Sequence, residues 1–189
     1  MKRILIASLA ALIIFVIGVT CGGLWMKHRY SSKNSQTNPS IPSDTLITLE
    51  RTGCYGPCPT YTVVISADGR VIFSGTYFAK VNGSNQFKKS GVIESNISDQ
   101  QLRELIAEFN RANYFSLRDS YRDARDGCPD HLTDMSSAYT SIQINGRKKS
   151  VEHYLGCRYD GSNGAPYPNE LVAVEAAIDQ IVNTKQWMQ

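Results

Sequence analysis

The sequence predicts an α+β domain, in which an antiparallel β-sheet is packed by two α-helices and an N-terminal transmembrane helix precedes it. Segments in which apolar and polar residues alternate flank turn-forming glycines. Two other stretches repeat apolar residues at helical spacing. The amino end holds one long uncharged apolar run. We therefore divide the chain into an anchor at residues 4–26, a linker at 27–43 and a single α+β domain at 44–189.

The apolar run of residues 4–26 has no charged residue and follows Lys2 and Arg3. Its length suits a membrane-spanning helix, which needs about 20 apolar residues. We expect a single-pass anchor, and the alternatives are a cleaved signal sequence and a lipid attached to Cys21. Residues 27–43, which become rich in Ser, Asn and Pro, are expected to form a flexible linker.

The formal charge of +3 arises from basic residues that flank the apolar run. Five of them lie there, and without them fifteen basic residues face seventeen acidic ones. This balance gives no basic patch for nucleic acid. Basic residues lie on both sides of the run, so the positive-inside rule does not determine how the anchor is oriented in the membrane. The cysteines do, because paired cysteines are typical of oxidising compartments. We expect the inner (cytoplasmic) membrane, with the C-terminal domain on the periplasmic or extracytoplasmic side.

A β-hairpin around residues 67–69 is the clearest local prediction. The flanking residues alternate between apolar and polar, and the glycine of this three-residue loop suits a left-handed conformation after a type I turn. The loop length fixes the register and places four apolar side chains on one face. The expected pairs are Ile65 with Val71 and Val63 with Phe73.

Further strands are predicted from alternation and turn signals. Residues 46–51 alternate, and a strand over 87–95 follows a turn at 82–85. The Asn145-Gly146 pair is the strongest short-range hairpin signal in the chain. A two-residue turn there places Ile142 and Val151 on the same face of the hairpin.

Two amphipathic helices are predicted to cover one face of the sheet. Ser98 and Gln101 form a capping box at the start of the first helix. The second helix begins at Pro168-Asn169. The apolar stripes of the two helices are Leu102, Leu105, Ile106 and Phe109, then Leu171, Val174, Ile178 and Ile181.

The most informative motif is a cysteine pair, Cys54 and Cys58, with prolines on both sides of the second cysteine. It resembles a thioredoxin-type redox motif with one added residue, but Pro59 leads into a strand rather than into the helix that would stabilise a thiolate. We expect two structural disulfides, one in this motif and one between Cys128 and Cys157. A redox centre and a four-cysteine zinc site are the alternatives.

Acidic residues are concentrated in segment 119–134, beside His131. The segment lacks the alternating carboxylates of a calcium loop, so we expect a solvated loop, with a metal site as the alternative. His153 lies in a predicted strand and is expected to be half-buried rather than a general base. A hydrolase that uses His131 or His153 with Asp130 or Asp134 is a further alternative. The acids of the segment are Asp119, Asp123, Asp126, Asp130 and Asp134.

The stretch from Leu49 to Tyr61, which contains the cysteine motif, resembles the bacterial domain of unknown function family DUF6438. The resemblance extends through Asp68-Gly69, Phe73-x-Gly75 and residues 115–117. It implies an exported or membrane-anchored bacterial domain with no activity, cofactor or catalytic residue to assign. Cys128 and Cys157 lie outside the family pattern.

The function expected from these observations is that of a non-catalytic binding module of the bacterial cell envelope, held at the membrane by its N-terminal helix. Its partner would be an envelope protein or a cell-wall ligand. No catalytic, cofactor-binding or metal-binding residue is predicted. The alternative is a thiol-redox or metal-dependent enzyme that uses Cys54 and Cys58.

Overall fold

A computed structural model describes residues 40–81, 84–158 and 168–188, and from Ile41 onward they belong to one compact unit. The predicted anchor at 4–26 and all of the linker before residue 40 lie outside the described residues. Within the described ranges, no helix has the length and apolar character needed to cross a membrane.

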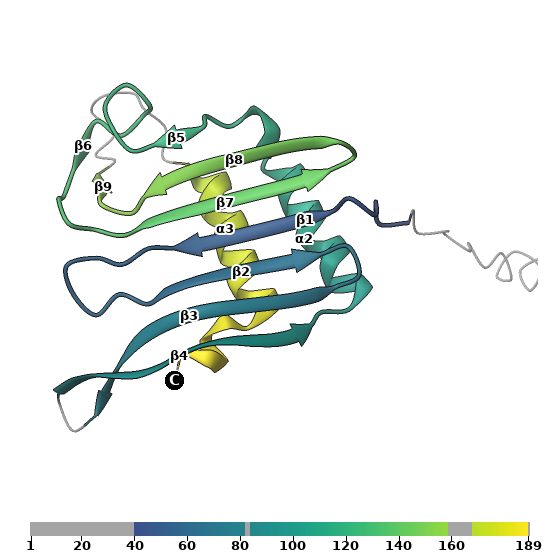
Figure 1. The fold of residues 1–189 in the computed structure, drawn as a ribbon. Coiled ribbons are helices and arrows are strands. Elements are labelled where there is room, and N and C mark those ends of the chain that lie inside the picture. The colour runs from purple at the N-terminus through teal and green to yellow at the C-terminus, as the bar shows by residue number, and fades with distance from the viewer. Residues whose placement is uncertain (1–39, 82–83, 159–167, 189) are drawn as a thin grey trace, which may run out of the picture. The chain divides into compact units, whose positions relative to one another are not determined.

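The domain is a seven-stranded sheet with two helices, α2 and α3, on the same face (Figure 1). The strand order is β4-β3-β2-β1-β7-β8-β5, and every neighbouring pair is antiparallel except β8 with β5. This arrangement confirms the α+β class, the large antiparallel sheet and the two helices. The strands of the sheet are β1 (Leu46–Arg51), β2 (Thr60–Ser66), β3 (Arg70–Val81), β4 (Ser84–Asn96), β5 (Ser120–Tyr121), β7 (Ser137–Ile144) and β8 (Arg147–Tyr154).

Smaller elements complete the domain. A second sheet pairs β6 with β9 in antiparallel orientation, and two short 3₁₀-helices follow α2 and α3. None of these small elements was predicted, because segments of two to four residues carry too little periodicity to be recognised. Their bounds are β6 (Asp130–His131), β9 (Cys157–Arg158), η1 (Tyr114–Ser116) and η2 (Thr184–Trp187).

Both predicted hairpins are present with the predicted registers. In the β2–β3 hairpin the N–H of Gly69 donates to the Ser66 carbonyl at 2.9 Å, and Gly69 has a φ of +78°. The pairs Ile65–Val71 and Val63–Phe73 are confirmed.

In the β7–β8 hairpin Asn145 and Gly146 form the two-residue turn, both with positive φ. The Asp44 carboxylate accepts their two N–H groups at 3.0 and 2.6 Å, so the start of the domain is bound to this turn. The hydrogen bond from Gly146, followed by that from Asn145, lowers the pKa of Asp44, although its slight desolvation acts in the opposite direction. Ile142 and Val151 are both buried, as predicted.

The two helices begin at the predicted residues. The predicted capping box starts α2 (Asp99–Arg111), since Ser98 and Gln101 exchange backbone and side-chain hydrogen bonds at 3.3 and 2.9 Å. Helix α3 (Asn169–Val182) starts after Pro168. It is capped at its C-terminus by Asn183, which has the left-handed conformation. Their buried residues form one core with the helix-facing side of the sheet.

The predicted strand 87–95 is longer in the structure, where β4 begins at Ser84. The predicted turn at 82–85 is therefore wrong at its last two residues, while residues 82–83 lie outside the described ranges. The unpredicted strand β5 pairs in parallel with β8 through two residues only.

Gly75 occupies a helix-facing position in β3 where no side chain fits. It pairs with Tyr61, whose ring stacks on that of Phe73 at a centroid distance of 5.4 Å. A Cβ atom at Gly75 would lie 2.8 Å from both Tyr61 Cβ and Phe73 Cζ. The glycine is therefore required by close packing, and its φ is not in the left-handed region.

We expect Gly75→Ala to lower the free energy of unfolding by about 1–3 kcal/mol, because the two aromatic rings must move to admit a methyl group. Gly91, which pairs with Gly75, is the matched control, since a Cβ there has no neighbour within 4 Å. Urea denaturation of both variants measures the difference. Equal losses in the two variants would show that close packing at Gly75 is not the cause.

Candidate functional site

A row of side chains crosses the helix-facing side of four adjacent strands. Tyr61 of β2 pairs with Arg51 of β1, Arg51 pairs with Ala138 of β7, and Ala138 pairs with His153 of β8. Strand alternation places Arg51 on the same face as the fully buried Leu49. A guanidinium is thus directed under the helices, where it needs compensating charge.

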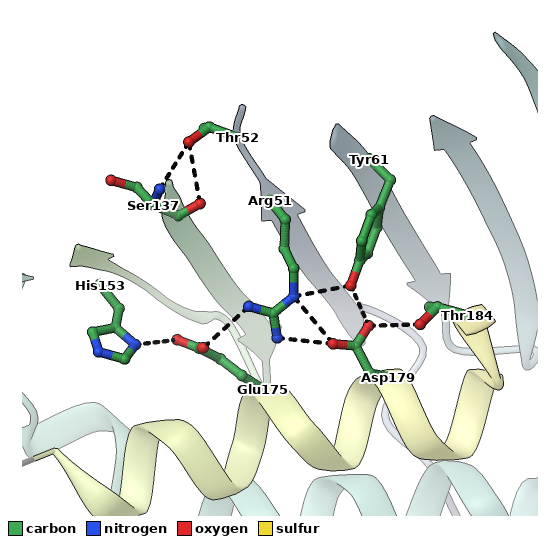
Figure 2. A network of polar contacts seen from close by, with 8 residues as sticks. All are labelled: Arg51, Thr52, Tyr61, Ser137, His153, Glu175, Asp179 and Thr184. Atoms are coloured by element: carbon green, nitrogen blue, oxygen red, sulfur yellow. Dashed lines mark hydrogen bonds and ion pairs between the residues drawn. The ribbon is translucent and has the colours of Figure 1, made fainter. Parts of the chain in front are cut away.

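Helix α3 supplies that charge through two carboxylates one turn apart, as Figure 2 shows. Asp179 receives four hydrogen bonds from three side chains. Its Oδ2 accepts from Nε and Nη2 of Arg51 at 3.1 and 2.8 Å. Its Oδ1 accepts from the hydroxyls of Tyr61 and Thr184 at 2.6 and 2.9 Å. One carboxylate therefore joins β1, β2, α3 and η2.

Glu175 lies between Arg51 and His153 (Figure 2). Its Oε1 is 3.1 Å from His153 Nδ1, and its Oε2 is 3.6 Å from Arg51 Nη1. The side chains of Glu175 and His153 are only 4% and 3% exposed. Ala138 separates Arg51 from His153 in the row, and its small side chain leaves room for the glutamate to reach both. His153 is thus in the expected strand but buried, not half-buried.

The polar network controls the protonation of its members. Burial acts to lower the pKa of Arg51, but the charge and the hydrogen bonds of Asp179, together with the charge of Glu175, outweigh it and raise that pKa. Burial is also the main reason that the pKa of Tyr61 is raised, despite the opposing charge of Arg51. Tyr61 therefore remains a protonated hydrogen-bond donor to Asp179 well above neutral pH.

A cleft of about 430 Å³ opens beside the exposed side of this network. Arg51 and Tyr61 form its sheet wall, and the other wall consists of the end of α3 and the η2 segment. Asp179 lies at the junction and is 23% exposed. The network is thus buried at Glu175 and accessible to small molecules at Asp179.

The four predicted disulfide cysteines are paired as expected. The Cα atoms of Cys54 and Cys58 are 5.6 Å apart, and those of Cys128 and Cys157 are 5.5 Å apart. Strand β2 follows Cys58 after one residue, so the motif does not lie at the amino end of a helix. A helix-stabilised thiolate, on which thioredoxin-type chemistry depends, is therefore not built into this motif.

Tyr55 projects from the loop that the Cys54–Cys58 bond closes. Its side chain is 93% exposed, while its backbone N–H donates to the Asp134 carbonyl at 2.9 Å. The neighbouring backbone segments are joined by hydrogen bonds from Leu132 N–H to Gly156 and from Leu155 N–H to Ser136. These segments carry three further exposed apolar side chains, and with Tyr55 they form what we call the Tyr55 surface: Tyr55, Leu132, Met135 and Leu155.

The predicted acidic loop contains internal hydrogen bonds instead of a convergent metal site. Asp126 accepts the N–H groups of Arg122 and Asp123 at 2.8 and 2.6 Å, and Asp123 pairs with Arg125. Among the described residues, no three His, Cys, Asp or Glu side chains are arranged to hold a metal ion.

The two histidines of the hydrolase hypothesis have different environments. His131 is exposed in β6, at a centroid distance of 6.0 Å from the Tyr154 ring, whereas His153 is buried beside Glu175. Asp130 and Asp134 are exposed, and the amide of His131 donates to Asp130 at 2.8 Å. The ring of His153 therefore has Glu175 as its carboxylate neighbour, and the hydrogen bond between His131 and Asp130 involves the backbone amide of the histidine and not its ring.

The polar network was missed in the sequence, although two signals point to it. Arg51 continues the core-facing positions of β1, and Glu175 falls within the apolar stripe formed by Leu171, Val174 and Ile178. A charged residue on each of two buried faces predicts an ion pair between them. Asp179, one turn further along α3, follows from the same spacing.

The fold and site define a disulfide-bonded α+β domain in which a buried ion network fixes a helix to a sheet. The family model described as "Domain of unknown function (DUF6438)" matches residues 45–182. The chain therefore belongs to this family, as its cysteine motif indicated. Comparison with curated proteins finds no match.

We expect Asp179→Asn to lower the free energy of unfolding by about 1–3 kcal/mol, because Arg51 loses its main counter-charge in a mostly buried position. Asp123→Asn is the control, since its partner Arg125 is exposed to solvent and screening leaves that pair with no measurable effect on stability. Urea denaturation at neutral pH measures both. A loss in Asp123→Asn as large as that in Asp179→Asn would contradict the role of the network.

Proposed function

We propose that this chain is a membrane-anchored, extracytoplasmic binding domain of the bacterial cell envelope, and that it acts without catalysis. The uncharged run at residues 4–26 supports the anchor. The two disulfides support an oxidising compartment, because such bonds are rare in cytosol. Together these features favour a domain held outside the membrane by a linker.

The Tyr55 surface is the observation that carries the binding role. Among the residues whose side chains the structure describes, a set without 76–89, four of the six exposed large apolar side chains belong to it, and both disulfides border it. Clustered exposed apolar side chains mark interaction sites, and tyrosine is enriched among residues that dominate binding energy. The disulfide loop also holds Tyr55 in place before binding, which lowers the entropic cost of association.

The Tyr55 surface is better suited to a protein partner than the open face of the sheet. Figure 1 shows the β1–β2 loop and the β6–β9 sheet at one end of the large sheet, while the chain enters β1 at the other end. The open face of the sheet is a less suitable contact because it presents mainly polar side chains, such as Thr48 and Ser141, whose hydroxyls bond to each other at 2.6 Å.

The compartment is tested with the full chain produced in bacterial cells. We expect it to remain in the membrane fraction after a high-salt wash, and to be digested by protease added to spheroplasts. Its disulfide cysteines should resist alkylation until a reductant is added. A variant without residues 4–26 serves as the control and should leave the membrane fraction. Protection from protease, or alkylation without reductant, would contradict the proposed location.

The binding role is tested with a photo-crosslinking amino acid at position 55 of the full chain in living cells. We expect one protein adduct, and we expect Met135→Ser to abolish it, since both positions belong to the Tyr55 surface. Position 92 is the control, because Val92 is 66% exposed but lies on the edge strand β4. An adduct that forms equally from position 92, or that persists in Met135→Ser, would refute this contact.

A further inference from the structure

The cleft beside Asp179 lies outside the Tyr55 surface, and a binding role for that surface does not explain it. Its sheet wall contributes Arg51, and its helical wall contributes Gln180, Asn183 and Lys185. These four side chains come from β1, α3, η2 and the residue that follows α3. They nevertheless line one space of about 430 Å³.

The carboxylate groups beside the cleft are already occupied as acceptors. A carboxylate offers about four lone-pair sites, and Asp179 receives four hydrogen bonds from Arg51, Tyr61 and Thr184. Glu175, behind it, is buried and lies against Arg51 and His153. A ligand that brings donors to these carboxylates would therefore have to displace an internal bond, and the acceptors that stay open among the described residues are the amide oxygens of Gln180 and Asn183.

Donor groups, by contrast, are in surplus. Among the described residues, Arg51 donates from Nε and Nη2 to Asp179 and from Nε to Tyr61, so the surplus donors belong to the other three side chains. The remaining nitrogen, Nη1, is in an ion pair with the buried Glu175 at 3.6 Å. In the described part of the chain, the side chains of Gln180, Asn183 and Lys185 make no hydrogen bond or ion pair. The cleft is thus suited to a ligand rich in acceptors.

The charges of the cleft define the ligand further. Arg51 and Lys185 balance Glu175 and Asp179 in number, but the two carboxylates are paired internally, whereas the ammonium of Lys185 is exposed. The free charge that a ligand meets is therefore positive. Ala176 and Met188 add apolar lining with room for a small aliphatic group.

We propose that this cleft binds a small carboxylate attached to a short aliphatic group, such as the free carboxyl end of a peptide with small side chains. Lys185 pairs with the carboxylate, and the amides of Gln180 and Asn183 donate to its oxygens. This site uses none of the residues of the Tyr55 surface, so it stands independently of the proposed function.

The test compares N-acetyl-alanyl-alanine with its C-terminal carboxamide, which keeps the shape but removes the charge. Ligand-observed saturation-transfer NMR on the full chain in detergent detects weak binding. We expect the acid to bind with a dissociation constant on the order of 1 mM, and the amide at least about tenfold more weakly. Equal signals for acid and amide, or no signal for the acid, would overturn the proposal.

Variants identify the site. We expect Lys185→Gln to weaken binding of the acid about tenfold, because a hydrogen bond to a charged group is lost. Lys185→Arg should retain binding. Lys148→Gln is the matched control, since Lys148 is also exposed but lies on β8 outside the cleft. The same loss in Lys148→Gln and Lys185→Gln would place the ligand elsewhere, and Tyr55→Ser should leave binding of the acid unchanged.

Discussion

The ion pair between Arg51 and Asp179 is the interaction on which the arrangement of this domain depends. Strand alternation directs Arg51 toward the core, and a charge in that position is tolerated only with a partner and further hydrogen bonds. Asp179 provides both and also accepts from Tyr61. A shift of α3 by one residue would remove Glu175 and Asp179 from the row. The network therefore specifies how the helix lies on the sheet.

The same carboxylate also controls the loop that presents Tyr55. Arg51 ends β1 and Tyr61 is the second residue of β2, so Asp179 binds the chain on both sides of the connecting loop. Within the loop, Thr52 exchanges hydrogen bonds with Ser137, as Figure 2 shows, and the Cys54–Cys58 bond closes the tip. The buried ion pair and the exposed loop that carries Tyr55 are thus linked through a few residues of the chain.

Sequence patterns predicted the parts of the fold that depend on nearby residues. The loop at 67–69, the Asn145-Gly146 turn and the capping box at Ser98 each satisfy local backbone requirements, and the structure contains all three. The network was not predicted because it joins Arg51 to a helix 128 residues away, and no local rule specifies that contact. The cysteines were recognised because their chemistry and compartment limit the alternatives.

The stability of the domain and the specificity of its fold have different sources. Next to the polar row lies a mainly apolar one, in which Leu49 pairs with Val63 and Thr140 pairs with Val151, and Leu49, Val63 and Val151 are fully buried. Burial of such side chains supplies the driving force, whereas a buried ion pair gains little beyond its desolvation cost. The network is better understood as selecting one packing of α3 among several that apolar contacts alone would allow. The exposed end of the network, at Arg51 and Asp179, lines the cleft, while the end at Glu175 and His153 stays buried.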